Sequence, residues 1–133
     1  MAASSAELHE PAEKLGPETI DRHRAIVSLM EELEAVDWYD QRVAASDDDQ
    51  LRAILAHNRD EEKEHAAMTL EWLRRHDPAL DTMLRQYLFT SEPVTEIETE
   101  AEAGDGGSDV ESNASRVPST SLNIGSLAGK EGL

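Results

Sequence analysis

The chain contains no cysteine, so it can form neither a disulfide nor a thiolate metal site. Basic residues are also scarce, because 12 Lys and Arg stand against 29 Asp and Glu, for a formal net charge of -17. Such a surface is a poor partner for nucleic acid and for anionic membranes, whereas cations are attracted to it. The lack of cysteine also fits a reducing cytosol.

Long apolar runs are missing as well. No stretch approaches the roughly 18 apolar residues of a membrane-spanning helix, and the first residues lack the basic start and apolar run of a secretory signal. We therefore expect a soluble, cytoplasmic protein, and 133 residues leave room for one domain. No Ser-His-Asp arrangement, phosphate-binding loop or nucleotide fingerprint occurs. Any chemistry must therefore come from a metal.

The spacing of apolar residues predicts an all-α protein built on two long helices. Gly16-Pro17-Glu18 is typical of a helix start, and the first helix should run to about Ala44. Its apolar positions form a heptad-like seam, which Asp40 interrupts. The members of this seam are Ile26, Leu29, Leu33, Val36 and Val43.

The second long helix follows after a short turn. Ser46-Asp47-Asp48-Asp49 supplies a strong N-cap, and the helix should end at Arg74-Arg75-His76, before Asp77-Pro78. Because the link is so short, the two long helices should form an antiparallel hairpin. A shorter third helix is expected from about Pro78 to Phe89.

The rest of the chain is predicted to be irregular. Residues 1–15 are polar and should be flexible, whereas residues 16–90 carry the helical domain. Residues 91–120 are acidic and rich in Gly, Ser and Thr, which is typical of a disordered linker. Residues 121–133 regain apolar side chains, so they are either a docking peptide or an incidental apolar patch.

A hairpin of this size buries too little apolar surface to be stable alone. Small domains usually need disulfides, a metal or self-association. Disulfides are excluded, so metal binding and oligomerisation remain.

The inner face of the second helix changes character at its middle. Apolar residues occupy both ends of this face and polar residues the centre. In order, the face is Leu51, Leu55, Asn58, Glu62, His65, Thr69 and Trp72. A buried carboxylate costs several kcal/mol unless it is paired or metal-bound. A divalent cation held by Glu62 and His65 would explain the pattern, whereas Glu61 and Glu64 point away from this face.

One carboxylate of the first helix is placed to complete this set. Glu32 lies beside the seam at seven-residue spacing from Ala25 and Tyr39, and the Tyr39 hydroxyl is in reach of a ligand carboxylate. Oxygen and imidazole ligands without sulfur suit iron or manganese, with zinc as a substitute, and the carboxylate-rich set favours iron. Glu-x-x-His alone is weak support, since exposed helices often carry it as solvated charge.

The set is half of a di-iron site. Four-helix di-iron proteins use two lone Glu residues and two Glu-x-x-His pairs, one contribution from each helix. This chain offers one of each on two helices, which predicts that two identical chains meet around the metal. Redox chemistry is one outcome; a non-redox metal buffer and a metal-dependent structural dimer are the alternatives.

A second acidic stripe lies on another face of the first helix. Glu31, Glu34 and Trp38 are spaced by three and four residues. They form either a solvated acidic surface or a low-affinity outer cation site that Trp38 covers. We assign no role to the remaining histidines, His9, His23, His57 and His76.

Several blocks of the sequence closely resemble the encapsulated ferritins. The resemblance spans about residues 7–94, and the tail Ser121–Gly129, SLNIGSLAG, looks like the peptide that loads cargo into encapsulin shells. The blocks that carry it are MEELEAVDWY at 30–39, HNRDEEKEH at 57–65, TLEWLR at 69–74 and YLFT at 87–90.

The resemblance implies a ferroxidase that converts Fe(II) to Fe(III) with O2. It places iron ligands on Glu32, Glu62 and His65 with Tyr39 close by, and calcium, zinc or manganese are potential substitutes. It places an outer cation site on Glu31 and Glu34, beside Trp38. Two hairpins would form a metal-bridged dimer with a ferritin-like four-helix bundle, and dimers would assemble into an open ring, commonly a decamer.

The same resemblance implies that iron is delivered to the interior of an encapsulin nanocompartment. The apolar side chains of Leu122, Ile124 and Leu127 would dock in a groove of the shell protein, and Gly125 would let the backbone lie close. Neither nucleic acid nor membrane is expected as a partner.

Overall fold

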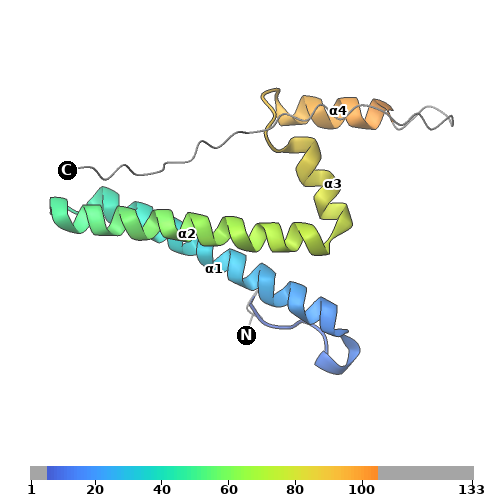
Figure 1. The fold of residues 1–133 in the computed structure, drawn as a ribbon, viewed down its shortest axis with the longest axis horizontal. Helices are drawn as coiled ribbons and strands as arrows, with labels where there is room; N and C mark the ends of the chain where they lie inside the picture. The colour runs from blue at the N-terminus through green and yellow to red at the C-terminus, as the bar shows by residue number, and fades with distance from the viewer. Residues whose placement is uncertain (1–5, 105–133) are drawn as a thin grey trace, which may run out of the picture.

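The computed structural model describes residues 6–104, all helical or irregular (Figure 1). The chain order is a short 3-10 helix η1 (Ala12–Lys14), α1 (Pro17–Ala45), α2 (Asp49–His76), α3 (Pro78–Tyr87) and α4 (Val94–Gly104). The prediction of an all-α fold with a long hairpin and a short third helix is confirmed. The short helix η1 lies in the segment that was expected to be irregular. Residues 1–5 and the tail from 105 onward, including the linker remainder and 121–133, lie outside the described residues.

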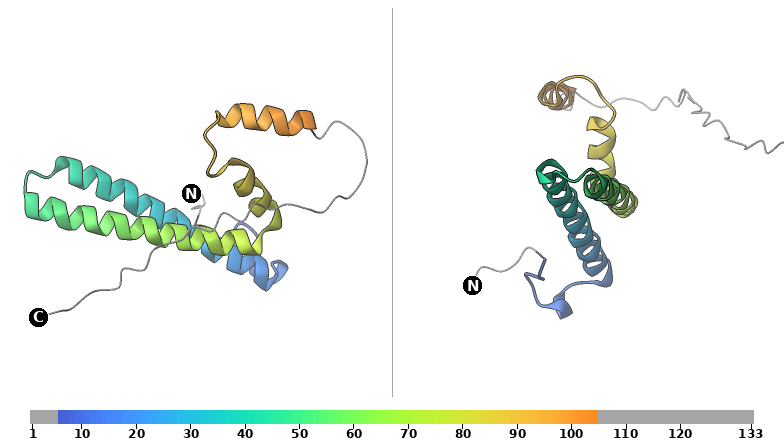
Figure 2. Two further views of the ribbon diagram at one scale, coloured as in Figure 1. Left: turned by 45° about the horizontal axis from the view of Figure 1, so that its top comes forward. Right: turned by 90° about the vertical axis from the view of Figure 1, so that its left-hand side faces the viewer.

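The hairpin of α1 and α2 is the main body of the fold. The two helices run antiparallel and side by side in both views of the ribbon (Figures 1 and 2). Pro17 takes the first position of α1, where a missing N–H costs nothing. Asp48 caps α2, since its side chain accepts a hydrogen bond of 2.9 Å from the backbone N–H of Leu51. Three residues therefore suffice to reverse the chain.

Hydrogen bonds and ion pairs of acidic and basic side chains stabilise the junction of α2 and α3. Asp77 caps α3 by accepting a hydrogen bond of 3.0 Å from the N–H of Leu80. Arg74 donates to Glu71 on its own helix at 2.6 Å and to Asp81 on α3 at 2.5 Å. These contacts fix the direction in which α3 leaves the hairpin.

The one positive backbone φ angle among the described non-glycine residues lies shortly after α3. Phe89 has φ of 59° and is fully exposed. The extended C-cap residue Leu88 separates it from the helix, and glycine is the usual occupant of such a left-handed position. The helix ends at Tyr87, two residues before the predicted end.

Helix α4 corrects one prediction, since residues 94–104 were expected to belong to a disordered linker. Glu and Ala dominate this segment and both are strong helix formers, so acidity alone does not prevent a helix. The carbonyl of Pro93 accepts hydrogen bonds from the N–H groups of Glu96 and Ile97, at 2.9 and 3.2 Å, and so starts it. Helix α4 lies against α3, away from the hairpin (Figure 1).

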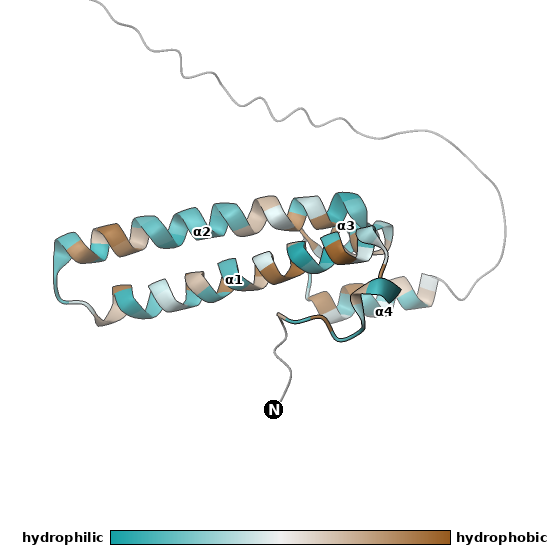
Figure 3. Cartoon of the chain, turned by 90° about the horizontal axis from the view of Figure 1, so that it is seen from below, coloured by the Kyte–Doolittle hydropathy of each residue, from teal (hydrophilic) through white to brown (hydrophobic). Residues whose placement is uncertain are grey.

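Very little of the described chain is buried. Only Ala66 and Leu73, both on α2, are buried in residues 6–104, with exposed fractions of 7% and 4%. Polar and apolar residues alternate along both long helices (Figure 3). Many large apolar side chains are exposed by 40% or more, including Ile26, Met30, Leu33, Ile54 and Met68. Within the same range, none of the helices has the length and apolar content needed to cross a bilayer.

Candidate metal centre

Three side chains meet between the middle of α1 and the middle of α2. Glu62 and His65 stand one turn apart on the same face of α2, since residues i and i+3 are neighbours on a helix. The antiparallel hairpin brings Glu32 of α1 opposite them. Both glutamates are half-buried, with side chains 27% and 24% exposed for Glu32 and Glu62, whereas the His65 side chain is 49% exposed.

The distances suit a shared cation. The Nδ1 atom of His65 lies 3.2 Å from Oε2 of Glu62 and 3.7 Å from Oε2 of Glu32. One ligand atom from each of the three residues lies within 4.8 Å of the others. Because a divalent cation holds such ligands at about 2.0–2.2 Å, ligands of one ion are roughly 3–4 Å apart. Small side-chain adjustments would therefore suffice.

The electrostatics of the three groups are linked. The pKa of Glu32 is raised, first by its hydrogen bond with Glu62 and then by burial and the charge of Glu62. The same hydrogen bond, with that of His65, lowers the pKa of Glu62. The pKa of His65 is raised, mainly by its hydrogen bond to Glu62. The proximity of the three groups thus makes Glu32 easier to protonate, Glu62 harder to protonate, and the charged form of His65 more favourable than in isolation.

The composition of this cluster indicates which ions it fits. Two carboxylates and an imidazole, without sulfur, suit iron, manganese or zinc. Three ligands leave such an ion with free coordination positions, and His65 is the most exposed of the three side chains. Among the described residues, no other group of three or more His, Asp or Glu side chains comes this close together.

Tyr39 lies near the centre in sequence but does not join it here. Its ring is half-buried, and the guanidinium carbon of Arg42 lies 5.3 Å from the ring centroid. Within residues 6–104 its hydroxyl makes no hydrogen bond, so the expected bond to a ligand carboxylate is not formed in the single chain.

The outer stripe lies on the surface of α1. Glu31 and Glu34 are exposed, and the Trp38 residue is 50% exposed. No third ligand from the described residues joins the two carboxylates. The geometry of one chain is therefore that of an acidic surface patch with an aromatic side chain next to it.

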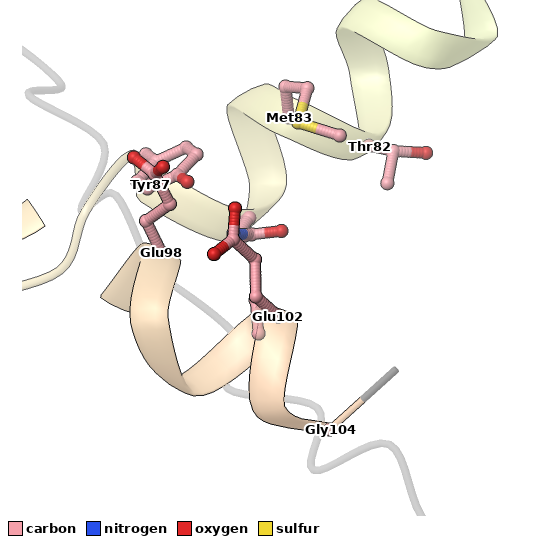
Figure 4. Close-up of a pocket in the computed structure, with 8 residues that line it drawn as sticks. Thr82, Met83, Tyr87, Glu98, Glu102 and Gly104 are labelled. Atoms are coloured by element: carbon pink, nitrogen blue, oxygen red, sulfur yellow. The ribbon is translucent and has the colours of Figure 1, made fainter. Parts of the chain in front are cut away.

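A hollow elsewhere in the molecule has different chemistry. It lies between α3 and α4, with a volume of about 690 Å³, and Tyr87, Glu98 and Glu102 are among the residues that line it (Figure 4). It contains no imidazole, and its two carboxylates come from one helix. It is separate from the metal cluster of the hairpin and offers no comparable ligand set.

Sequence reasoning missed two polar contacts close to the centre. His57, which was given no role, lies 3.0 Å from Glu61 on the exposed face of α2. Arg59 of α2 donates to Asp40 of α1 at 3.0 Å, across the hairpin. The signal for this second contact was present in the sequence, because Asp40 interrupts an apolar seam.

Comparisons with known proteins identify relatives of this chain. The model of the EncFtn-like family matches residues 7–91. An encapsulated ferritin-like protein of Rhodospirillum rubrum is 63% identical over 134 residues, which cover 100% of this chain and 96% of the relative. A ferritin-like protein of Thermotoga maritima is 57% identical over 96 residues, 72% of this chain and 84% of the relative.

Two further relatives extend the comparison. The encapsulin nanocompartment cargo protein EncC of Myxococcus xanthus is 34% identical over 106 residues, covering 76% of this chain and 79% of the relative. The crystal structure of protein ne0167 from Nitrosomonas europaea superposes with a TM-score of 0.64 at 66% sequence identity. That superposition covers 65% of this chain and 96% of the other.

Proposed function

The chain belongs to the EncFtn-like family, and on that premise we propose that it is a ferroxidase whose active site is completed by two copies of the chain. The resemblance to the encapsulated ferritins found in the sequence is thereby confirmed at the level of the family. The observation that carries the proposal is the meeting of Glu32, Glu62 and His65 within 4.8 Å. The substrates are Fe(II) and O2, and the products are Fe(III) and reduced oxygen, which takes up the released electrons together with protons from water.

The need for a second copy follows from the ligand count. Ferritin-like di-iron sites take one carboxylate from each of two helices and one Glu-x-x-His pair from each of two others. One chain supplies half of this set. Two chains joined through the open side of the cluster would supply six ligands and a four-helix bundle.

Exposed apolar surface beside the cluster supports the same arrangement. Met68 lies one turn after His65 on α2 and is 59% exposed, and Met30 and Leu33 are further exposed apolar residues of α1, at 42% and 54%. Exposed apolar patches rimmed by polar residues commonly mark interaction sites. A dimer would cover these side chains, and we propose that dimers associate further into an open ring, commonly a decamer in this family.

The protonation states of Glu32, Glu62 and His65 affect how readily the site binds a cation. A cation binds the deprotonated forms of Glu32 and Glu62 and the neutral imidazole of His65, so that metal binding competes with protons at all three residues. Iron bound there supplies the redox chemistry, in which each Fe(II) loses one electron and O2 accepts it. The partly exposed edge at His65 leaves a path for the ions. In the dimer, Tyr39 is proposed to bond a ligand carboxylate.

Cation delivery is the proposed role of the outer stripe. Glu31 and Glu34 are exposed neighbours of Glu32 on α1, so they can concentrate Fe(II) near the centre. Trp38 lies on the same face of α1 and would cover this outer cation site.

The proposed partner is an encapsulin shell protein, with the chain held inside the nanocompartment in the cytoplasm. Two relatives are an encapsulated ferritin-like protein and an encapsulin nanocompartment cargo protein, and the first aligns with the whole of this chain. The apolar segment at 121–133 is the proposed docking peptide. Iron oxidised by the ring would then be released into the shell interior.

The experiment that tests the proposal is the rate of Fe(II) oxidation in air, followed by the absorbance of Fe(III). Protein that speeds this rise above the rate in buffer alone acts as a ferroxidase. A metal buffer would bind Fe(II) and slow the rise, and a purely structural dimer would leave the rate unchanged. Either of these two results would overturn the redox assignment while leaving metal binding in place.

A further inference from the structure

Asp40, which interrupts the apolar seam of α1, pairs with Arg59 of α2. Asp40 occupies a position where the heptad pattern calls for an apolar residue. Its Oδ1 atom accepts a hydrogen bond of 3.0 Å from Nη1 of Arg59. The Asp40 side chain is 54% exposed and that of Arg59 is 23% exposed, so the pair lies at the edge of the seam, where it contributes little to stability.

The Arg59 side chain is unusually constrained for a surface cation. Its Nε atom donates to Asp60 on the same helix at 3.1 Å while Nη1 reaches Asp40 on the other helix. The Arg59 side chain is only 23% exposed, and hydrogen bonds to both carboxylates raise the pKa of its guanidinium. Because Asp60 holds the planar guanidinium in place, the position of Asp40 relative to α2 is restricted.

This contact is one of two ion pairs that cross the hairpin within residues 6–104. The other joins His65 to Glu32 at 3.7 Å and consists of metal ligands. A bound cation would replace that second pair, because both partners would turn their lone pairs to the ion. The Asp40–Arg59 pair would then remain as the ionic contact between α1 and α2.

The buried apolar residues of the hairpin lie on the opposite side of the metal cluster from Asp40 and Arg59. The two buried apolar residues of the described chain, Ala66 and Leu73, lie on α2 after His65, on the side away from the turn. Asp40 and Arg59 lie on the other side of the cluster, toward the turn at 46–48. The metal cluster therefore stands between the two buried apolar residues and the Asp40–Arg59 pair, and the apolar side chains Val43 and Leu55 on the turn side are half-buried.

Register matters at this cluster because its ligands come from two helices. A slip of one helical turn moves a side chain by about 5.4 Å along the axis. Such a slip would carry Glu32 out of reach of an ion held by Glu62 and His65. A single polar residue in an apolar seam is a known means of fixing the register of paired helices, at a cost in stability.

We propose that Asp40 and Arg59 set the register of α1 against α2 and thereby place Glu32 opposite Glu62 and His65 for cation binding. The two residues are positioning residues and do not touch the ion. The inference rests on the proposed function, because it assumes that the cluster binds a divalent cation. It assigns to the Asp40–Arg59 pair a role in metal affinity beyond any role in folding.

The test uses the full-length protein and Co(II) as the probe. Affinity is measured by titration calorimetry, ligand geometry by the visible spectrum of bound Co(II), and stability by thermal unfolding without metal. The central variant is Asp40→Leu with Arg59→Met, which restores an apolar seam. We expect it to unfold at or above the temperature of the parent, yet to bind Co(II) about tenfold more weakly and with an altered spectrum.

Two further variants make the result specific. Exchange of the partners, Asp40→Arg with Arg59→Asp, keeps the cross-helix pair and should restore most of the affinity. Asp21→Leu removes an ion pair of 2.7 Å that lies within α1 alone, and should leave the affinity of the parent. This matched control separates the loss of any charge from the loss of the cross-helix contact.

The outcomes distinguish this inference from the function on which it rests. A parent that binds no Co(II) overturns the proposed function and the inference with it. A parent that binds Co(II), with parental affinity and spectrum in the apolar variant, overturns the register role alone. The same holds if the exchanged pair binds as weakly as the apolar variant.

Discussion

The Nδ1 atom of His65 lies 3.2 Å from the Oε2 atom of Glu62, one turn earlier on the same helix. The two side chains are therefore already oriented toward each other before any ion arrives. Because both belong to one helix, their relative position is set by the helix itself, whereas the position of Glu32 depends on how the neighbouring helix packs. The following predictions start from this geometry.

Removal of either ligand of α2 should abolish rapid oxidation of Fe(II). Glu62→Ala and His65→Ala each remove two ligands from a site shared by two chains, so we expect the rate to fall at least about tenfold. The rate is measured as the rise of Fe(III) absorbance in air. Glu64→Ala is the matched control, since Glu64 is an exposed carboxylate on the same helix. Parental activity in Glu62→Ala would show that the ligands are assigned wrongly.

Changes in the outer stripe should affect delivery of the ion and leave the site itself intact. We expect Glu31→Ala and Glu34→Ala to alter the oxidation rate by roughly a few-fold, because exposed carboxylates raise the local cation concentration. The effect should shrink at high salt, which screens surface charge. The visible spectrum of Co(II) bound at the inner site should match that of the parent, and loss of this spectrum would instead place these residues in the inner site.

Assembly should depend on metal. In the absence of a cation, two copies of Glu32 and Glu62 would face each other across the dimer, and close carboxylates repel. We expect sedimentation velocity to show smaller species in the presence of a chelator than with Fe(II) under anaerobic conditions. An identical large assembly in both conditions would contradict a metal-bridged interface.

Acid should weaken the junction of α2 and α3 through Glu71. Its hydrogen bonds to Arg74 lower the pKa of this carboxyl from 4.5 to about 2. A carboxyl with a lowered folded-state pKa stabilises the fold above its unfolded-state pKa, and this contribution is lost as the pH falls from about 4.5 to about 2. Glu71 is partly exposed, so the effect should be modest.

The measurement compares thermal unfolding midpoints of the parent and Glu71→Gln at about pH 5 and about pH 3. The parent should lose more stability than the variant between these two values, because Gln does not titrate. Equal losses would assign the acid sensitivity to other carboxyls.

The tail should be needed for encapsulation and dispensable for chemistry. Deletion of residues 121–133 removes the proposed docking peptide, so the truncated protein should oxidise Fe(II) at the parental rate but fail to co-purify with the shell protein. Many copies on one ring would make weak individual contacts sufficient in the parent. Replacement of Leu122, Ile124 and Leu127 by Ser should have the same effect. Recovery of either variant in shells at the full-length level would refute the docking role.

Much of the fold was accessible from the sequence because local signals agreed. Pro17, the Asp48 cap and the Asp77-Pro78 step mark helix boundaries by their own chemistry, and the structure places the boundaries there. The Glu32, Glu62 and His65 cluster was accessible because polar residues replaced apolar ones on facing stripes. Helix α4 was missed because composition was weighed above the helix propensity of Glu and Ala.

Contacts between side chains on different helices were harder to foresee. The interruption of the apolar seam at Asp40 was visible in the sequence. The residue of α2 that pairs with Asp40 was not, because it depends on the rotation and register of the two helices. The sequence does not distinguish Arg59 from the other basic residues of α2 as the partner of Asp40. In the same way, the packing of Arg42 on the ring of Tyr39 depends on side-chain conformations that periodicity does not encode.

The scarcity of buried side chains has a consequence for how the chain exists before it finds a partner. With Ala66 and Leu73 as the buried residues of the described range, a lone hairpin has little internal stabilisation. Under the proposed dimerisation, its folded population would follow mass action, so that the concentration of the chain would decide how much of it is helical. A newly made chain at low abundance would then be open to proteolysis until it met a second copy, and synthesis in bursts or on neighbouring ribosomes would shorten that interval.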